Sequence, residues 1–237
     1  MKLCIIPARG GSKRIPRKNI RNFLGKPVIA YSILSALESN LFDAVIVSTD
    51  DDEIAEVARQ YGAIIPFKRP AEISEDFSTT ADVLLHAIEW YESTGCKVSE
   101  MTCIYPVNPF VTKELLMDGY RQWKARGAKY CFAVSEFNSA PQRALKMNKD
   151  GRIESMYPQF RSTRTQDLEV GYFDAGMFYF CETEAYKKEI PMHSEASSPY
   201  VLPRHLAHDI DTEEDWDYAE KLFKIVMQET KLVRERL

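Results

Sequence analysis

Long hydrophobic runs are missing from this chain of 237 residues. No apolar segment approaches the roughly 18 residues that a membrane-spanning helix requires, so we expect no membrane protein. The first apolar stretch, KLCIIPA, is too short for the core of a signal peptide, and basic residues follow it instead of preceding it. We therefore expect no secretory leader and a cytoplasmic location.

Cysteine pairs with the spacing of a redox or zinc motif are also absent. The five cysteines form an odd number without a CxxC, and Cys4, Cys103, Cys131 and Cys181 lie in apolar runs. This pattern is typical of reduced thiols in a cytoplasmic protein. We expect all five, including Cys96 near a turn, to be small core residues.

The excess of positive charge that a general nucleic-acid-binding protein needs is missing as well, because the net charge is −4. The four histidines have no metal-ligand spacing, and the sequence contains neither a Walker motif nor GxGxxG. With 45% hydrophobic residues, a chain of this length can bury a core without disulfides or metal. We expect residues 1–237 to form one domain.

Short apolar segments alternate with amphipathic ones along most of the chain. Strands are predicted over residues 2–8, 44–50, 63–67, 101–106, 129–137 and 172–181. Helices are predicted over residues 26–40, 51–62, 113–127 and 212–228, and after the capping pair Thr79 and Asp82. This order predicts an α/β fold, a Rossmann-like and mostly parallel sheet with helices on both faces.

Residues 138–171 break this alternation. They contain turn residues and charges but no long periodic segment. We interpret them as a lobe or arm inserted into the domain. The residues themselves leave open whether this arm docks on another subunit or is a mobile loop.

A glycine-rich turn with six basic side chains between Arg9 and Arg21 follows the first predicted strand. Backbone N–H groups of such turns bind phosphate, and Gly10 and Gly11 would let an anion approach closely. Cations on a short loop repel one another unless an anion lies between them, so we expect a triphosphate here. A solvated basic loop is the alternative. Its position favours a site, because ligands of open α/β sheets bind beyond the carboxyl ends of strands.

Two aspartates, Asp209 and Asp211, lie in the sequence HDIDT. Alternation along an extended segment places both carboxylates on one side. Such a pair suits Mg²⁺, which prefers oxygen ligands and also holds waters and phosphate oxygens. Capping of the last helix would explain Asp211 alone but not the pair, so we favour a metal site.

Several motifs, in order, resemble one enzyme family. These motifs are similar to the signatures of the CMP-sugar-acid synthetases, also called acylneuraminate cytidylyltransferases. In chain order they are IIPARGGSKRIPRKNI, KRPAEIS, YPVNP, RSTRTQ, FDAG and DIDTEEDW. The resemblance covers nearly the whole chain. Arg14 and Tyr105 replace the glycine and the glutamine that sialic-acid members usually carry, and in this they resemble the pseudaminic acid branch.

The resemblance implies transfer of CMP from CTP to the anomeric hydroxyl of a nonulosonic acid, with pyrophosphate as leaving group and Mg²⁺ as cofactor. Lys18 would be the main catalytic residue, assisted by Arg9 and Asp211. Nucleotide contacts would come from Arg9, Gly10, Gly11, Ser12, Lys13, Lys18, Arg69, Ser78 and Thr80. Arg14 and Arg17 would be secondary phosphate contacts or exposed charges.

The resemblance also implies where the sugar acid binds. Arg143 and Arg164, with Arg161 as a weaker companion, would hold its carboxylate, because planar arginine suits that group. The rest of the pocket would be Tyr105, Asn108, Gln166, Tyr172, Phe173 and Asp174, although the two aromatics at 172 and 173 are more often core or interface residues. Relatives dimerise through such an arm, which completes the sugar pocket, so we expect a homodimer.

Pseudaminic acid is the favoured acceptor, for a surface or flagellar glycan, and legionaminic or sialic acid is the nearest alternative. A CTP sensor without catalysis is an alternative from another class. The joint presence of Lys18, Asp209 and Asp211 argues against a sensor. Binding of nucleic acid through the basic turn is a further alternative, and the acidic net charge argues against it.

Overall fold

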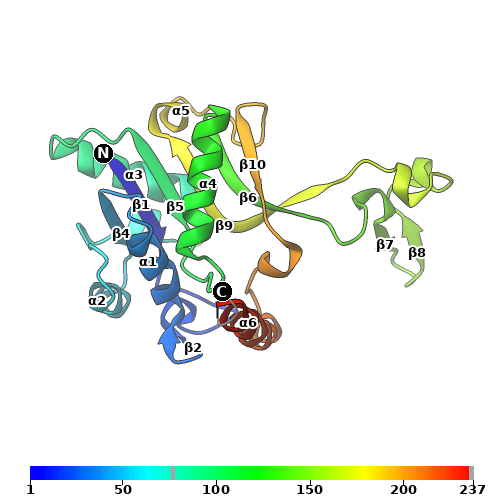
Figure 1. Ribbon diagram of the computed structural model, residues 1–237, viewed down its shortest axis with the longest axis horizontal. Helices are drawn as coiled ribbons and strands as arrows, with labels where there is room; N and C mark the ends of the chain where they lie inside the picture. The colour runs from blue at the N-terminus through cyan, green and yellow to red at the C-terminus, as the bar shows by residue number, and fades with distance from the viewer. Residues whose placement is uncertain (76–77, 235–237) are drawn as a thin grey trace.

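A six-stranded sheet forms the centre of the computed structural model, which describes residues 1–75 and 78–234 (Figure 1). The strand order is β10-β6-β9-β5-β1-β4. Along the chain the strands are β1 (Lys2–Pro7), β4 (Ala44–Ser48), β5 (Glu100–Ile104), β6 (Tyr130–Glu136), β9 (Tyr172–Glu182) and β10 (Ser197–Val201). β9 runs antiparallel to β5 and β6, and the other pairs are parallel. The predicted mostly parallel sheet is confirmed.

Helices cover both faces of this sheet. One face packs against α1 (Val28–Glu38), α2 (Asp52–Gln60), α4 (Lys113–Arg126) and α6 (Glu213–Arg234). The other face packs against α3 (Thr80–Ser93) and α5 (Thr183–Lys187). None of these helices, in the part of the chain that the structure describes, combines the length and the apolar character needed to cross a membrane.

Local capping fixes where two of the helices begin. At α3 the Thr79 side chain accepts a hydrogen bond from the Asp82 N–H, and the Asp82 carboxylate accepts one from the Thr79 N–H. Thr212 and Asp215 form the same reciprocal pair before α6, with distances of 2.8 and 3.2 Å. Each such cap stabilises a helix by about 1 kcal/mol. Both capping pairs are therefore as the sequence predicts.

Several segments differ from the prediction. Residues 63–67 form only a single bridge, between Ile46 and Ile64, instead of a strand. The hairpin of β2 (Asn22–Phe23) and β3 (Lys26–Pro27) occupies the predicted start of the first helix, so α1 begins at Val28. β10 and α5 lie where no element is predicted. β10 depends on a parallel pairing with β6, and the local sequence pattern does not encode such a distant contact.

The cysteines are all free, and four of them are buried. Cys96 is exposed, which corrects the prediction that all five belong to the core. It follows Gly95, whose φ of 86° marks the turn after α3, so its side chain lies outside the packed sheet.

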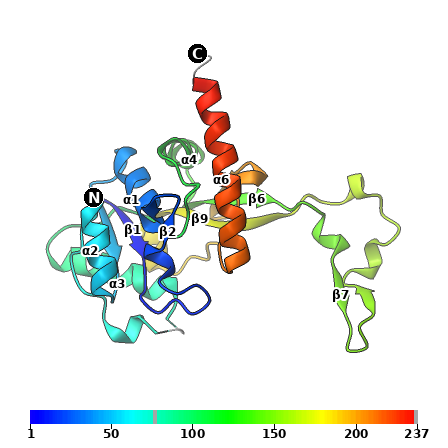
Figure 2. The same cartoon turned by 90° about the horizontal axis from the view of Figure 1, so that it is seen from below.

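Residues 138–171 project from the ends of β6 and β9 as an extended arm (Figures 1 and 2). The arm carries a short hairpin, β7 (Leu145–Met147) paired with β8 (Ile153–Ser155). Its apolar residues Leu145, Met147 and Ile153 are 61%, 71% and 59% exposed. Exposed apolar residues grouped on one hairpin are typical of a surface that a partner covers.

Candidate active site

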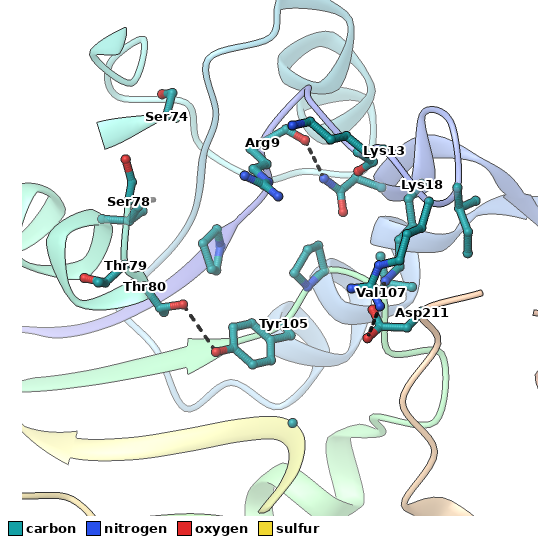
Figure 3. Close-up of a pocket in the computed structure, with 18 of the residues that line it drawn as sticks. Arg9, Lys13, Lys18, Ser74, Ser78, Thr79, Thr80, Tyr105, Val107 and Asp211 are labelled. Carbon is teal, nitrogen blue, oxygen red and sulfur yellow. Dashed lines mark hydrogen bonds and ion pairs between the residues drawn. The ribbon is translucent and has the colours of Figure 1, made fainter. Parts of the chain in front are cut away.

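A cleft of about 580 Å³ opens at the carboxyl ends of β1 and β5 (Figure 3). Volumes of this size are typical of small-molecule sites. The walls come from the basic turn after β1, the segment before α3, the end of β5 and the segment before α6. The predicted site residues that line the cleft are Arg9, Ser12, Lys13, Lys18, Arg69, Ser78, Thr80, Tyr105, Asp209 and Asp211.

The basic turn is held in shape by its own polar contacts. The Asn19 side chain, which is buried, donates a hydrogen bond of 2.8 Å to the Arg9 carbonyl. The Gly10 N–H donates to Asp50 at 3.0 Å, and a Cβ at Gly10 would lie 2.8 Å from an Asp51 carboxylate oxygen. Gly10 is therefore needed for close packing on the end of β4. The Gly10 N–H therefore donates within the protein, and the close approach of a phosphate to this turn stays a prediction.

Arg17 points away from the cleft. Its guanidinium pairs with Asp51, with one contact of 2.9 Å, and with Glu53 at the start of α2. Arg17 also has a left-handed backbone conformation, with φ of 54°. The Asp51 carboxylate caps α2 by accepting from the Ile54 N–H, and the hydrogen bond from Arg17 is the main reason that its pKa is lowered to about 2. Arg17 thus anchors the turn to α2 instead of contacting phosphate.

Asp50 joins the basic turn to a buried arginine. Besides the Gly10 N–H, it accepts a hydrogen bond of 3.2 Å from the guanidinium of Arg69, whose side chain is 3% exposed. Ser74 accepts from the other side of Arg69 at 3.1 Å. Burial lowers the pKa of Arg69, Asp50 opposes this change, and the nearby charge of Arg9 adds to it. Arg69 is thus fixed between two acceptors at the wall of the cleft.

Lys18 and Asp211 come from opposite ends of the chain and meet in the cleft. The Lys18 Nζ lies 3.1 Å from one Asp211 oxygen, and Arg14 lies 2.8 Å from the other (Figure 3). Burial alone would raise the pKa of Asp211, but the hydrogen bonds and charges of Lys18 and Arg14 lower it. The alternative that Asp211 only caps α6 does not hold, because Thr212 supplies that cap.

Asp209 lies beside Asp211 in the same wall of the cleft. Desolvation raises the pKa of its carboxyl group, and the charge of Asp211 raises it further. A cation between the two carboxylates would remove this repulsion, so the pair fits a divalent ion. Among the described residues no group of three or more histidine, cysteine or acidic side chains could hold a metal. Waters and phosphate oxygens would therefore complete the coordination, as is usual for Mg²⁺.

The wall opposite the basic turn is polar and aromatic. The Thr80 Oγ1 lies 3.3 Å from the Tyr105 hydroxyl, and Ser78 donates to the Glu72 carbonyl at 3.3 Å. Thr79, and not Thr80, supplies the cap of α3, so the Thr80 hydroxyl remains directed at the cleft. Ser78 and Thr80 line the same cleft as Arg69, so this wall offers hydroxyl groups to a bound ligand.

The predicted carboxylate-binding arginines do not lie in the cleft of their own chain. Arg143 donates to backbone carbonyls of Phe160 and Arg161, each at 3.4 Å, and of Thr163. Arg164 pairs with Asp167 at 2.7 Å. Both belong to the projecting arm, as does the exposed Gln166 (Figure 1).

The remaining predicted sugar residues lie behind or beside the cleft. Asn108 is buried and donates to the carbonyl of Gly176 at 3.3 Å, so it supports the wall without reaching the cavity. Asp174 accepts from the Tyr179 hydroxyl at 2.7 Å. Tyr172 is 51% exposed, and Phe173 packs against Phe137 at the root of the arm.

Sequence reasoning missed Asp50, Ser74 and Asn19. Asp50 lies in the acidic run STDDDEI, which the helix dipole explains for Asp52 and Glu53 but not for a residue that precedes the helix cap. The position of Asp50 directly after a parallel strand was the available signal.

Comparisons with known proteins show which family this chain resembles. A family model described as Cytidylyltransferase matches residues 3–222. The pseudaminic acid cytidylyltransferase of Campylobacter jejuni subsp. jejuni serotype O:2 is 44% identical over 223 residues, covering 94% of this chain and 96% of that protein. The CMP-N,N'-diacetyllegionaminic acid synthase of Legionella pneumophila is 30% identical over 230 residues, with the same coverage.

A solved structure of CMP:2-keto-3-deoxy-manno-octonic acid synthetase complexed with CTP has a TM-score of 0.65 at 14% identity, covering 94% of this chain and 98% of that chain. This likeness confirms the Rossmann-like fold. The match to the family model and the 44% identity to a curated cytidylyltransferase show that the protein is a nucleotidyltransferase enzyme. Within that class, the chain belongs to the cytidylyltransferase family.

Proposed function

We propose that this enzyme transfers CMP from CTP to the anomeric hydroxyl of pseudaminic acid and releases pyrophosphate. The observation that carries the proposal is the meeting of Lys18 with Asp211 in the cleft that also contains Arg69 and Thr80. The 44% identity to a pseudaminic acid cytidylyltransferase supports this acceptor. The product would be a donor for surface or flagellar glycans, made in the cytoplasm.

In this reaction the anomeric oxygen forms a bond to the α-phosphorus, the hydroxyl proton passes to water, and the bond from that phosphorus to pyrophosphate breaks. Such transfers depend on alignment and on positive charge near the entering and leaving oxygens. Arg9, Ser12, Lys13 and Lys18 would hold the triphosphate, and Lys18 would neutralise charge on the leaving group. Asp209 and Asp211 would hold Mg²⁺, which when bound lowers the pKa of the attacking hydroxyl.

The direct test supplies CTP and Mg²⁺ with pseudaminic, legionaminic or sialic acid and measures pyrophosphate release. We expect the highest kcat/KM with pseudaminic acid and a CMP-sugar of the matching mass. Higher kcat/KM with legionaminic or sialic acid would overturn the acceptor while keeping the reaction. Tight CTP binding without pyrophosphate release with any of the three would instead indicate a sensor.

Asp50→Asn is expected to raise KM for CTP by about tenfold and to leave KM for the sugar acid nearly unchanged. The reason is that the Asp50 carboxylate accepts hydrogen bonds from both the Gly10 N–H and the Arg69 guanidinium. It thereby joins the basic turn, which would hold the triphosphate, to Arg69 in the wall of the cleft. Steady-state kinetics with each substrate varied in turn would measure the effect. Asp43→Asn is a matched control, since Asp43 accepts the Lys2 N–H far along the sheet. An unchanged KM for CTP in a folded Asp50→Asn variant would contradict this role.

The enzyme is further proposed to act as a homodimer whose arm reaches the cleft of the partner. Arg143 and Arg164 belong to residues 138–171, which project from their own domain as an arm (Figure 2). Apolar residues of the hairpin in this arm are exposed. In a symmetric dimer each arm can bring its arginines to the other subunit, where they would bind the carboxylate of the sugar acid.

Mixing two inactive variants tests this arrangement. We expect Lys18→Ala and Arg164→Ala to be nearly inactive at low sugar concentration as separate homodimers. After subunit exchange, about half of the dimers are mixed, and one of the two clefts in each has an intact turn and an intact arm. Activity should therefore recover to about a quarter of the native value. No recovery, with exchange verified by mass spectrometry, would show that each arm serves its own chain.

A further inference from the structure

A second link between the two ends of the chain lies just outside the cleft. The Arg21 guanidinium donates to both carboxylate oxygens of Glu213, at 2.7 and 2.6 Å, and lies over the ring of Trp216, 4.6 Å from its centroid. Trp216 is buried and packs edge-to-face against Phe23. These three residues, Arg21, Glu213 and Trp216, form a clamp that joins the basic turn to the start of α6 by an ion pair and a cation–π contact.

Short backbone segments connect the clamp to the cleft. Lys18–Ile20 form a single turn of 3₁₀ helix, and the Arg21 N–H at its end donates to the Lys18 carbonyl at 3.3 Å. On the other side, Glu213 is the first residue of α6 and follows Asp211 by two positions. Lys18 and Asp211, which meet in the cleft, therefore lie within three residues of the clamp on either side.

The clamp differs from the ion pairs inside the cleft in how substrates would affect it. Arg14 and Lys18 both pair with Asp211. In the proposed reaction Asp211 would bind Mg²⁺ and Lys18 would bind the triphosphate, so both of these pairs would open. Arg21 lies outside the lining of the cleft, and its pair with Glu213 would persist. The clamp would thus keep the two segments together after the pairs in the cleft are lost.

We propose that Arg21 is a positioning residue, which together with Glu213 and Trp216 keeps Lys18 beside Asp211 during the transfer of CMP. This inference rests on the proposed function. Reactions of this kind depend on the alignment of charged groups, and a displacement of about 1 Å can lower the rate about a hundredfold. Arginine suits the role because its planar guanidinium can pair with a carboxylate and stack on a ring at once, which a lysine does less well.

Arg21→Gln removes the positive charge of the clamp and tests the proposal. We expect kcat to fall about tenfold, with KM for CTP and for the sugar acid within about twofold of the native values, because Arg21 lies outside the cleft. Arg21→Lys should recover part of the lost kcat. Glu213→Gln should lower kcat as Arg21→Gln does, and the double variant should lose no more than either single variant.

Two further measurements separate positioning from general support of the fold. In a Lys18→Ala background, Arg21→Gln should lower kcat by less than about twofold, because the clamp acts through Lys18. Since Asp211 would hold the ion, Mn²⁺ should bind the CTP complex of Arg21→Gln at least about threefold more weakly than the native complex. Electron paramagnetic resonance measures this affinity without turnover.

Lys124→Gln is the matched control. Lys124 also combines an ion pair with an aromatic contact, since its Nζ lies 2.7 Å from Glu100 and 4.6 Å from the ring centroid of Trp123. Glu100 begins β5, at the end of the strand opposite the cleft. Lys124→Gln and Arg21→Gln should lower the melting temperature by a similar amount, roughly a few degrees, but only Arg21→Gln should lower kcat.

The outcomes separate this inference from the function on which it rests. Native kcat and native Mn²⁺ affinity in a folded Arg21→Gln variant would overturn the clamp. Equal losses of kcat in Arg21→Gln and Lys124→Gln, or an undiminished loss in the Lys18→Ala background, would show general support of the fold and would also overturn it. A native enzyme that releases no pyrophosphate with any nonulosonic acid would overturn the proposed function, whereas weaker Mn²⁺ binding in Arg21→Gln would still support the clamp.

Discussion

Lys18→Ala is expected to lower kcat about a thousandfold, because it removes the positive charge that in the proposed mechanism would act on the leaving pyrophosphate. Lys18 is held in the cleft by Asp211 at 3.1 Å, and its side chain is 18% exposed. A contact that forms only as the phosphorus–oxygen bond breaks affects kcat and kcat/KM alike. KM for CTP should therefore change much less than kcat, in steady-state assays with saturating sugar acid.

The fold of the Lys18→Ala variant should remain intact. An ion pair with partly exposed partners contributes about 1 kcal/mol or less, so the melting temperature should fall by only a few degrees. Lys113→Ala is a matched control, since this lysine begins α4 and faces Glu38 at 3.8 Å, away from the cleft. Native-like kcat in the Lys18→Ala variant would remove Lys18 from the mechanism.

Asp211→Asn is expected to lower kcat by at least a hundredfold and to raise the Mg²⁺ concentration needed for half-maximal rate. The substitution removes one of the two carboxylates that would hold the ion and also breaks the pairs with Lys18 and Arg14. Asn keeps the shape of the side chain, so the loss reports charge and not packing. Titration of Mn²⁺ into the CTP complex, followed by electron paramagnetic resonance, should show weaker ion binding in the variant.

The control for this experiment is Asp52→Asn, whose carboxylate pairs with Lys68 on the surface of α2. It should bind Mn²⁺ and turn over CTP as the native enzyme does. Equal Mn²⁺ affinity in Asp211→Asn and in the native CTP complex would mean that other groups hold the ion. The Asp209–Asp211 pair would then serve only to orient Lys18.

The parts of this fold that the sequence predicts are those determined by neighbouring residues. The Thr79–Asp82 and Thr212–Asp215 pairs act within one helical turn, and the apolar runs at residues 44–50 and 101–106 mark strands buried on both faces. β10 was not predicted because its pairing partner β6 lies more than 60 residues away in the chain. Residues 63–67 have the composition of a strand but make only one bridge.

For the candidate site, too, some features can be predicted from the sequence and others depend on distant contacts. The resemblance to the CMP-sugar-acid synthetases points to Lys18 and Arg69, the spacing of the aspartate pair points to Asp211, and the structure brings all three to one cleft. What could not be predicted is how distant segments use their polar groups. The Gly10 N–H donates to Asp50, and the Arg17 guanidinium pairs with Asp51, because the end of β4 lies beside the basic turn. Contacts of this kind depend on strand order, which periodicity does not reveal.

The position of the nucleotide and its ion is tested most directly by a crystal structure with CTP and Mn²⁺, in which anomalous scattering locates the metal. We expect one Mn²⁺ peak within bonding distance of Asp209 and Asp211, with the triphosphate between that ion and the side chains of Arg9 and Lys18. A triphosphate bound away from the turn after β1, or a metal peak remote from both aspartates, would contradict the proposed site.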